Sequence, residues 1–279
     1  MNKVKIFAPA KVNFTLDILG VSQGFHNIKS LVSTLSLGDS IILKKRKDKM
    51  ITITQKGITF DCPLEQNNAY KSAKLFMESF DTCGVDIIIK KRILLGGGLG
   101  GSSADICAVL KGMKKLYQIN EDLVPLANQL GSDTAYMLNG GLAVIEGRGE
   151  IVTPIKKQKD FYLLLLGANS GVTSGECYKK FDSIGKTHPE ATDRAVENLK
   201  KGDYKGFISS LKNDLYAPAE SLCDEIGSNL KLLQEHGDCF MTGSGSVTVG
   251  IYPDKRSRNK AYRKLLSKVK TKLIKTKTK

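Results

Sequence analysis

The sequence lacks the features of a membrane-spanning protein and of a secreted, disulfide-bonded one. No apolar run approaches the roughly 18 residues of a membrane-spanning helix. The start, Met1-Asn2-Lys3-Val4, has no charged and apolar leader with a cleavage site, so we expect a cytoplasmic protein. The six cysteines are scattered without a CxxC pair. This spacing supports neither a disulfide framework nor a zinc site, and we expect reduced thiols that pack as small hydrophobic groups.

Acidic residues are missing from the C-terminal segment, which carries most of the net charge of +15. From Lys255 to Lys279 there are twelve Lys or Arg residues and no Asp or Glu, whereas the rest of the chain has 31 basic and 28 acidic residues. Only Tyr262 is aromatic in this segment, although single-stranded nucleic acids are bound by basic grooves with interleaved aromatic side chains. We therefore expect a solvated final helix with a frayed end, and no nucleic-acid partner.

Strand and helix patterns mix in both halves of the 279-residue chain, which predicts an α+β fold of two domains that flank a cleft. Apolar runs and alternation predict strands at 4–7, 11–18, 40–45, 50–55, 85–90, 142–146, 151–155, 161–166, 239–241 and 247–252. Helical spacing predicts helices at 67–80, 107–117, 122–130, 175–181, 192–200, 204–211 and 219–235. The lysine-rich residues 156–160 mark a boundary, which gives an N-terminal domain at 1–158 and a C-terminal domain with the basic tail at 159–279.

The predicted strand at 11–18 has one apolar and one polar face. Its sequence, KVNFTLDI, alternates so that the polar face carries Lys11, Asn13, Thr15 and Asp17. These groups suit the wall of a cleft, yet the pattern alone favours an ordinary strand with a solvated polar side. The segment Ala8-Pro9-Ala10 interrupts the chain between this strand and the one at 4–7, and residues 20–27 are expected to form a loop.

The most distinctive stretch runs from Gly96 to Asp105 and reads GGGLGGSSAD. It follows the strand predicted at 85–90 and precedes the helical pattern at 107–117. A backbone with so few side chains can wrap closely around a ligand and present amide N–H groups at the start of a helix. The usual ligand of such a site is a phosphate group.

Two common nucleotide-binding motifs fit this stretch poorly. The Walker pattern GxxxxGK[ST] is matched by Gly96 and Gly101, but Ser102 stands in place of the lysine that contacts the β- and γ-phosphates. The dinucleotide pattern GxGxxG is matched by Gly96, Gly98 and Gly101. Its acidic partner should end the next strand about 20 residues later, whereas the acids at 121–122 open a predicted helix. A nucleotide-dependent oxidoreductase is therefore the weaker alternative.

The third possibility is a kinase loop that holds phosphates with serine hydroxyls and a helix N-terminus. Six segments resemble, in order, motifs of the galactokinase, homoserine kinase, mevalonate kinase and phosphomevalonate kinase (GHMP) superfamily: APAKVNFTLDI at 8–18, GFH at 24–26, GGGLGGSSAD at 96–105, LGSD at 130–133, NDLYAPA at 213–219 and TGSGS at 242–246. The resemblance implies a two-domain fold with the active site in the interdomain cleft, and an ATP- and Mg²⁺-dependent small-molecule kinase. APAKVN and GFH favour a cytidine diphosphate ester of methylerythritol as substrate, with a mevalonate- or homoserine-type kinase as the alternative.

The resemblance also assigns roles to particular residues of this sequence. Asp133 is the expected catalytic base and Lys11 its cationic partner. The ATP phosphates are expected on Leu95, Gly96, Gly97, Gly98, Leu99, Gly100, Gly101, Ser102 and Ser103. The residues expected to bind the substrate are Asn13, Phe25, His26 and Asp133. No Mg²⁺ ligand is assigned, and Ser103 and Asp105 are the candidates.

The sequence departs from the family pattern at three places. Leu94 stands where the family has proline, and Phe25 replaces a tyrosine, which retains a stacking ring but removes a hydroxyl. Without a gap, Ser103 and Asp105 match the family pattern while Ser102 and Ala104 do not. The sequence therefore leaves open which serine contacts phosphate. It also leaves open whether the protein is a monomer or a homodimer.

Overall fold

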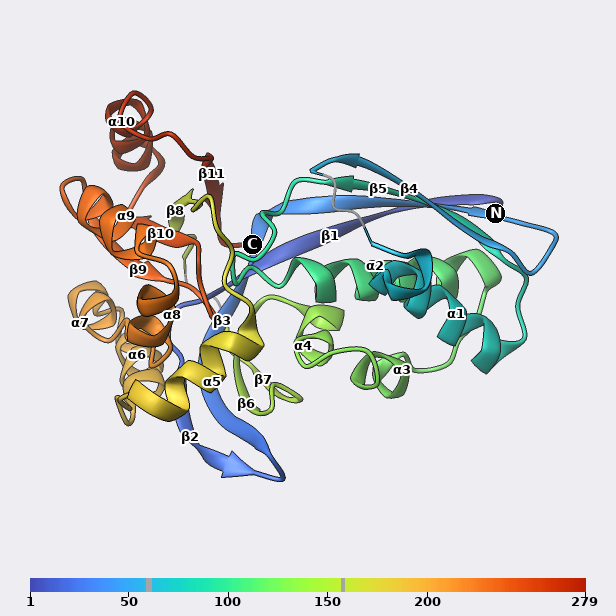
Figure 1. The fold of residues 1–279 in the computed structure, drawn as a ribbon, viewed down its shortest axis with the longest axis horizontal. Helices are drawn as coiled ribbons and strands as arrows, with labels where there is room; N and C mark the ends of the chain where they lie inside the picture. Colours follow the sequence, from blue (N-terminus) through green and yellow to red (C-terminus); the bar gives the residue numbers. More distant parts are fainter. Residues whose placement is uncertain (59–61, 157–158) are drawn as a thin grey trace. The chain divides into compact units, whose positions relative to one another are not determined.

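The fold is described from a computed structural model of residues 1–58, 62–156 and 159–279. The strands are β1 Lys3–Asn13, β2 Asp17–Ser22, β3 Phe25–Lys45, β4 Ile51–Gly57, β5 Val85–Lys91, β6 Leu142–Gly147, β7 Ile151–Pro154, β8 Tyr162–Leu166, β9 Asp238–Met241, β10 Thr248–Tyr252 and β11 Leu273–Lys277. The helices are η1 Leu64–Gln66, α1 Asn68–Phe80, α2 Gly101–Tyr117, α3 Val124–Asn128, α4 Thr134–Asn139, α5 Ser174–Ile184, α6 Ala191–Lys201, α7 Tyr204–Ser209, α8 Tyr216–Leu222, α9 Glu225–Gln234 and α10 Lys255–Leu265 (Figure 1). The α+β prediction is confirmed.

The chain forms two compact units, each built from separated segments. Unit 1 contains residues 1–10, 37–93 and 100–140, and unit 2 contains residues 11–36, 94–99 and 141–279. Strands β1 and β3 run through both units, because their residue ranges cross these limits. The boundary predicted at 158/159 falls beside residues 157–158, which lie outside the described residues.

In unit 1, two helices pack on one side of a short sheet. The parallel pair β4–β5 aligns Ile51 with Val85, and β5 runs antiparallel to the C-terminal part of β3. Figure 1 shows α1 and α2 on the same side of these strands. Helix α2 lies close against β3, since a Cβ placed on Gly112 would be 2.3 Å from Cδ1 of Leu43. The side chain of Asn67 caps α1 by accepting a hydrogen bond from the amide of Ala69.

In unit 2, an antiparallel sheet has the order β11-β8-β10-β9. Its core contains Leu164 and Leu166 of β8, packed with Leu233 of α9 and Leu265 of α10. A second part of the core surrounds Phe14, whose ring centroid lies 5.4, 5.5 and 5.8 Å from those of Phe161, Phe207 and Phe240. The N-terminal part of β3 pairs with β2 and β6 in the same unit.

Several strands extend beyond their predicted ends. Strand β1 is continuous through Pro9 because it pairs on one side, with β3, so the missing N–H need not enter a ladder. Residues 20–27 form a hairpin and not an open loop. Gln23 and Gly24 connect β2 to β3 with positive φ values of 52° and 77°, as a two-residue hairpin turn requires.

The polar face of residues 11–18 is buried, which contradicts the expected solvated side. Lys11, Asn13, Thr15 and Asp17 are each at most 5% exposed. Within unit 2, the amide of Thr192 donates to Asp17, and the hydroxyls of Thr15 and Thr192 lie 2.7 Å apart. Burial raises the pKa of Asp17 even though these hydrogen bonds oppose the shift. Alternation alone could not show that polar partners cover this face.

Several predicted helices change their limits, and one helix was not predicted. The helix predicted at 219–235 divides into α8 and α9, because Cys223 is extended with φ −150°. The helix predicted at 122–130 shortens to α3. Helix α4 was absent from the prediction, since six residues are too few to show a clear helical period.

The basic C-terminal segment is not a frayed helix. After α10, residues 273–277 form β11, which pairs with β8 and aligns Thr276 with Leu163. The sequence LIKTKTK alternates, so Thr276 and Thr278 are buried while the neighbouring lysines are exposed. The amide of Phe161 donates to the Thr278 hydroxyl, and the Thr278 amide donates to the Phe161 carbonyl, both at 3.0 Å. The many lysines drew attention away from the alternation of residues that is typical of a strand.

We expect Thr276→Asp to lower the free energy of unfolding by about 3 kcal/mol, because it moves a carboxylate from water into a buried position of β11. Lys275→Asp is the matched control, since Lys275 is the adjacent exposed residue and loses only a stacking contact with Tyr262. Urea denaturation of both variants gives the comparison. A loss in Thr276→Asp no larger than in Lys275→Asp would contradict the buried strand.

Candidate active site

The first part of the glycine-rich stretch, Leu94–Leu99, lies in unit 2 against the loop 242–246. A Cβ on Gly98 would lie 2.3 Å from the carbonyl oxygen of Thr242, and Gly98 has φ +70°. Both facts require glycine, because other residues rarely adopt this conformation and the backbones are nearly in contact. The amide of Ser246 donates to the Gly96 carbonyl at 3.1 Å. Residues 96–98 and the loop 242–246 therefore pack together within unit 2.

The second part, Gly100–Ser103, begins helix α2 in unit 1. Gly100 is the N-cap in the left-handed conformation with φ 66°, and no side-chain hydrogen bond caps the helix. The first amide groups of a helix have no partner within it, and α2 has no acidic residue in its first turn. Helix α2 has 17 residues, and its dipole places a partial positive charge at this N-terminus. Its N-terminus is suited to bind an anion.

The two serines of this helix start have different surroundings. The Ser102 hydroxyl accepts a hydrogen bond from Nδ2 of Asn68, and the side chain is exposed. Ser103 faces the turn at Gly131, where a Cβ would lie 3.5 Å from the Ser103 Oγ. Leu95, another residue expected to contact the ATP phosphates, is 45% exposed. The structure thus gives each hydroxyl a distinct neighbour within unit 1.

Lys11 and Asn13 lie together in unit 2, near the glycine-rich stretch. The Lys11 amide donates to the Leu99 carbonyl at 2.9 Å, and the Lys11 ammonium donates to Oδ1 of Asn13. Asn13 is held from two further sides. Its amide donates to the Thr242 hydroxyl at 2.8 Å, and its Nδ2 donates to the Ser30 hydroxyl at 2.7 Å. These hydrogen bonds fix both side chains. Lys11 is also buried, with only 5% of its surface exposed.

Asp133 precedes helix α4 in unit 1 and is partly buried. A turn aspartate at this position usually caps the next helix, but the Asp133 side chain makes no capping hydrogen bond to α4. Burial raises the pKa of the Cys107 thiol in α2 to about 12, and the charge of the Asp133 carboxylate adds to this shift. Cys107 is therefore an unreactive buried thiol, as expected, and Asp133 is not an ordinary helix cap.

Phe25 and His26 lie on the hairpin strand β3 in unit 2 and differ in exposure. The His26 side chain is 14% exposed, and its Nε2 lies 2.7 Å from Oδ1 of Asp182. Its ring stacks on Tyr178 with centroids 4.9 Å apart. Phe25 is 50% exposed, with the Arg148 guanidinium 3.6 Å above its ring. Within unit 2, the hairpin thus presents aromatic rings beside hydrogen-bonding groups.

Asp105 has a different environment from that of a metal ligand. Its Oδ2 accepts a hydrogen bond from Nζ of Lys91 at 2.7 Å, and its side chain is 9% exposed. Burial raises the pKa of the Asp105 carboxyl despite the neighbouring ammonium. Among residues 1–58, 62–156 and 159–279, no group of three or more His, Cys, Asp or Glu side chains could hold a metal ion. The described residues do not fit a protein-only metal site.

The structure also gives positioning roles to two residues of the NDLYAPA segment, to which the resemblance assigned no individual role. Nδ2 of Asn213 donates to the carbonyls of Met241 and Gly243 at 3.1 and 2.9 Å, which joins the NDLYAPA segment to the TGSGS segment. The adjacent Asp214 accepts hydrogen bonds from the amides of Ile18 and His188. Both side chains bind backbone groups of distant segments, a role that leaves no periodic signal in the sequence.

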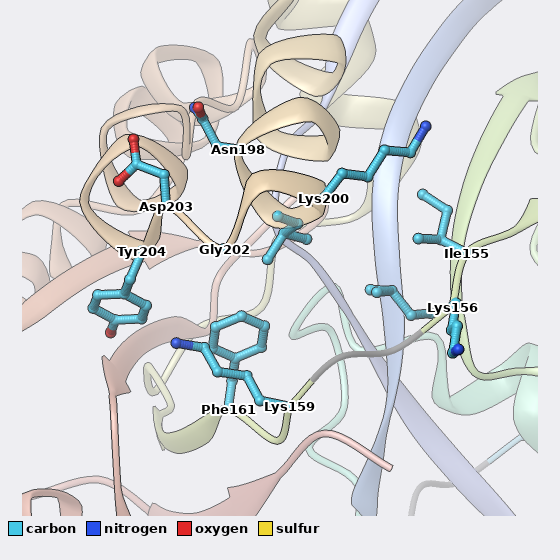
Figure 2. A pocket seen from close by; sticks show the side chains of 11 residues that line it. Ile155, Lys156, Lys159, Phe161, Asn198, Lys200, Gly202, Asp203 and Tyr204 are labelled. Carbon is cyan, nitrogen blue, oxygen red and sulfur yellow. The ribbon is translucent and has the colours of Figure 1, made fainter.

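A pocket in unit 2 lies apart from the predicted site residues. Figure 2 shows it between the side chains of Ile155, Lys156, Lys159 and Phe161 and the helices α6 and α7. It is lined by Leu142, Ile155, Lys156, Lys159, Phe161, Asn198, Leu199, Lys200, Gly202, Asp203 and Tyr204. None of these was predicted to bind nucleotide or substrate. In Figure 2 the labelled lysines point in different directions and do not converge on one point.

Two family models match the sequence. The description "GHMP kinases N terminal domain" matches residues 67–144, and "GHMP kinases C terminal" matches residues 195–271. A 4-diphosphocytidyl-2-C-methyl-D-erythritol kinase from Clostridium tetani is 36% identical, with 95% of this chain and 96% of that protein aligned.

The chain belongs to the GHMP kinase family.

Further relatives agree with this assignment. A 4-diphosphocytidyl-2-C-methyl-D-erythritol kinase from Bacillus thuringiensis is 33% identical over 90% of this chain and 88% of that protein. The crystal structure of a 4-(cytidine 5'-diphospho)-2C-methyl-D-erythritol kinase superimposes with a TM-score of 0.81 and 26% identity, covering 99% of this chain and all of that one. A homoserine kinase from Cytophaga hutchinsonii, at 17% identity and a TM-score of 0.76, shares the fold. The GHMP kinase assignment makes this chain an ATP-using small-molecule kinase. Among its described residues, no helix has the length and apolarity needed to traverse a membrane.

We expect Gly98→Ala to raise the dissociation constant for ATP about tenfold or more. The new methyl would meet the Thr242 carbonyl, and a residue other than glycine in this conformation costs about 1–3 kcal/mol. Gly175→Ala is the control, because Gly175 lies in α5 and a methyl group added there would meet open space. Calorimetric ATP titration of both variants is the measurement. Equal ATP affinity in the two variants would show that the close approach of Gly98 to Thr242 has no part in binding.

Proposed function

We propose that this GHMP kinase transfers the γ-phosphoryl group of ATP to the 2-hydroxyl of 4-diphosphocytidyl-2-C-methyl-D-erythritol. The products are the 2-phosphate and ADP, and the reaction belongs to non-mevalonate isoprenoid synthesis. The supporting observation is that relatives named for this kinase match 90–95% of the chain at 33–36% identity. The uncapped N-terminus of α2 agrees with a phosphate-binding role for the glycine-rich stretch.

The proposed nucleotide site is the stretch Leu95–Ser103. The amide groups that begin α2 would bind phosphate oxygens, and the helix dipole favours their negative charge. Phosphoryl transfer depends mainly on positioning and charge neutralisation. Because the described residues do not fit a metal site of their own, we propose that Mg²⁺ enters with the ATP phosphates as part of the substrate. Ser103, whose hydroxyl is not buried, is the candidate protein contact to the phosphates or their metal.

We propose Asp133 as the general base and Lys11 as the cation that stabilises the transferred group. The 2-hydroxyl oxygen forms a bond to the γ-phosphorus while the bond from that phosphorus to ADP breaks, and the hydroxyl proton passes to Asp133. Aspartate is a weak base with an ordinary pKa near 4, so its effect comes from placement. Support comes from the position of Asp133 in the turn before α4, where its side chain does not cap the helix, and from the fixed geometry of Lys11 beside Asn13.

The proposed site for the cytidine part of the substrate is the β2–β3 hairpin with Asn13. Phe25 is 50% exposed, and its ring, which already carries the Arg148 guanidinium on one side, can stack on a base. His26 is held by Asp182 and Tyr178, so its ring has a fixed direction. Such a site recognises a base by stacking and by hydrogen bonds to its polar edge. Asn13 lies in the same unit and would contact the substrate near Lys11.

Other expectations from the sequence stay predictions. The division into domains at 1–158 and 159–279 is one of them, and the two matched family regions, 67–144 and 195–271, lie on opposite sides of that limit. A cytoplasmic location, a monomeric or homodimeric state and the absence of a nucleic-acid partner are the others.

We expect the purified protein, given ATP and Mg²⁺, to release ADP with 4-diphosphocytidyl-2-C-methyl-D-erythritol and at least about 100-fold more slowly with mevalonate or homoserine, because neither carries the cytidine group that supplies binding energy. A coupled ADP assay with all three acceptors is the measurement. Turnover of mevalonate or homoserine alone would keep the kinase family and reject the proposed substrate.

We expect Asp133→Asn to lower kcat by about 10²- to 10⁴-fold, since the amide cannot accept the hydroxyl proton. ATP affinity should stay within about twofold of the unmodified protein. Asp122→Asn is the matched control, because Asp122 is exposed and accepts a hydrogen bond from the Val124 amide that asparagine can also accept. Steady-state kinetics and ATP titration test the pair. Near-normal turnover in Asp133→Asn would remove Asp133 from the role of base.

A further inference from the structure

Three buried charged residues meet at the base of the glycine-rich stretch, within unit 1. Nζ of Lys91 lies 2.5 Å from Oδ2 of Asp39 and 2.7 Å from Oδ2 of Asp105. The Lys91, Asp39 and Asp105 side chains are 3%, 0% and 9% exposed, respectively. Lys91 is the last residue of β5, Asp105 lies in the first turns of α2, and Asp39 belongs to β3. One ammonium group therefore joins the strand before the stretch to the helix after it.

Asp39 also fixes the backbone that leads into the stretch. Its Oδ1 accepts hydrogen bonds from the amides of Arg92 and Ile93, at 2.5 and 2.9 Å. Ile93 then lies against the start of α2, because its Cγ2 would be 3.0 Å from a Cβ on Gly101. The chain between Ile93 and Gly101 is thus closed at both ends by contacts inside unit 1. A glycine-rich segment has many accessible conformations when its ends are not held.

We propose that Lys91, with Asp39 and Asp105, is a positioning group that sets the entry and exit of the nucleotide loop and so determines the affinity for ATP. The inference rests on the proposed function only in that the loop binds ATP. The charged cluster does not touch the nucleotide; it acts through the backbone of residues 91–93 and through the first turns of α2.

The electrostatics of the cluster explain why lysine is needed at its centre. Burial lowers the pKa of Lys91, but the two carboxylates together more than offset this and raise it, so the ammonium stays charged. Removing the ammonium would leave two carboxylates facing each other in a buried site, which is strongly unfavourable. Oδ1 of Asp105 is buried and has no hydrogen-bond partner among the described residues. Asp105 therefore depends mainly on Lys91 to stabilise its charge.

Asp39 and Asp105 accept different sets of hydrogen bonds, so replacement by asparagine should affect them differently. Asp39 accepts from the Lys91 ammonium and from two backbone amides. Asn in its place would direct an NH₂ group at one of these donors. Asp105 accepts a hydrogen bond from Lys91, and the carbonyl of asparagine can accept it equally well. Asp39→Asn should therefore disturb the loop, and Asp105→Asn should be the milder matched control.

The experiment measures direct ATP binding by calorimetry, with no acceptor substrate present, in Lys91→Met, Asp39→Asn and Asp105→Asn. We expect the dissociation constant for ATP to rise at least about tenfold in Lys91→Met and Asp39→Asn, and by less than about threefold in Asp105→Asn. The KM for the acceptor should change by less than about twofold in all three. If Lys91→Met does not fold, the comparison of Asp39→Asn with Asp105→Asn decides.

A destabilised control separates positioning from general weakening of unit 1. Phe76 is fully buried in α1, its ring centroid lies 4.7 Å from that of Phe80, and it belongs to none of the hydrogen bonds of the charged cluster. Phe76→Leu should lower the melting temperature while the ATP dissociation constant stays within about twofold. Equal losses of ATP affinity in Phe76→Leu and Asp39→Asn, or parallel changes in ATP affinity and acceptor KM, would overturn the proposal. Failure of the unmodified protein to bind ATP would instead reject the proposed function.

Discussion

The close approach of two backbones is the constraint on which the candidate nucleotide site depends. Gly98 passes so near the carbonyl of Thr242 that no side chain fits between them, and its positive φ points the chain toward α2. The loop that supplies Thr242 also receives a hydrogen bond from the Asn13 amide and is held by Asn213. The glycines are thus needed for packing inside unit 2 as well as for any ligand. One geometric requirement explains why two distant segments, 96–98 and 242–246, both contain glycine where their backbones meet.

The charge of the site follows from the backbone groups at the start of α2. No side chain caps the helix, and its first turn has no acidic residue. Such an end binds anions without a Walker lysine, because amide groups and the helix dipole supply the positive potential. The nearest lysine on the preceding strand, Lys91, is turned into the protein and neutralised by Asp39 and Asp105. In the proposed site, the basic side chain would hold the loop while the backbone amides bind the phosphates.

Much of the candidate site could be predicted from the sequence. The strand, glycine stretch and helix around Gly96–Asp105 are visible from composition and spacing, since glycine runs and apolar periods are local signals. The family resemblance extended this to Lys11 and Asp133, which no spacing rule could have paired. The environment of Asp105 was not predictable, because its partners Lys91 and Asp39 come from separate strands. The same holds for His26, whose burial depends on Tyr178 and Asp182 from a helix more than 150 residues later.

The sequence by itself determined the α+β class, the family and the position of the glycine-rich stretch between a strand and a helix, because each rests on residues that are neighbours in the chain. Only the tertiary structure decided which charged groups are buried or paired and which are exposed. It buried the polar side of residues 11–18, enclosed Asp105 in an ion pair, and turned the lysine-rich tail into a strand beside β8. The physical reason is that burial and ion pairing depend on residues far apart in the chain. The pattern of neighbouring residues shows the period of a helix or strand, but it does not show which residues cover that element.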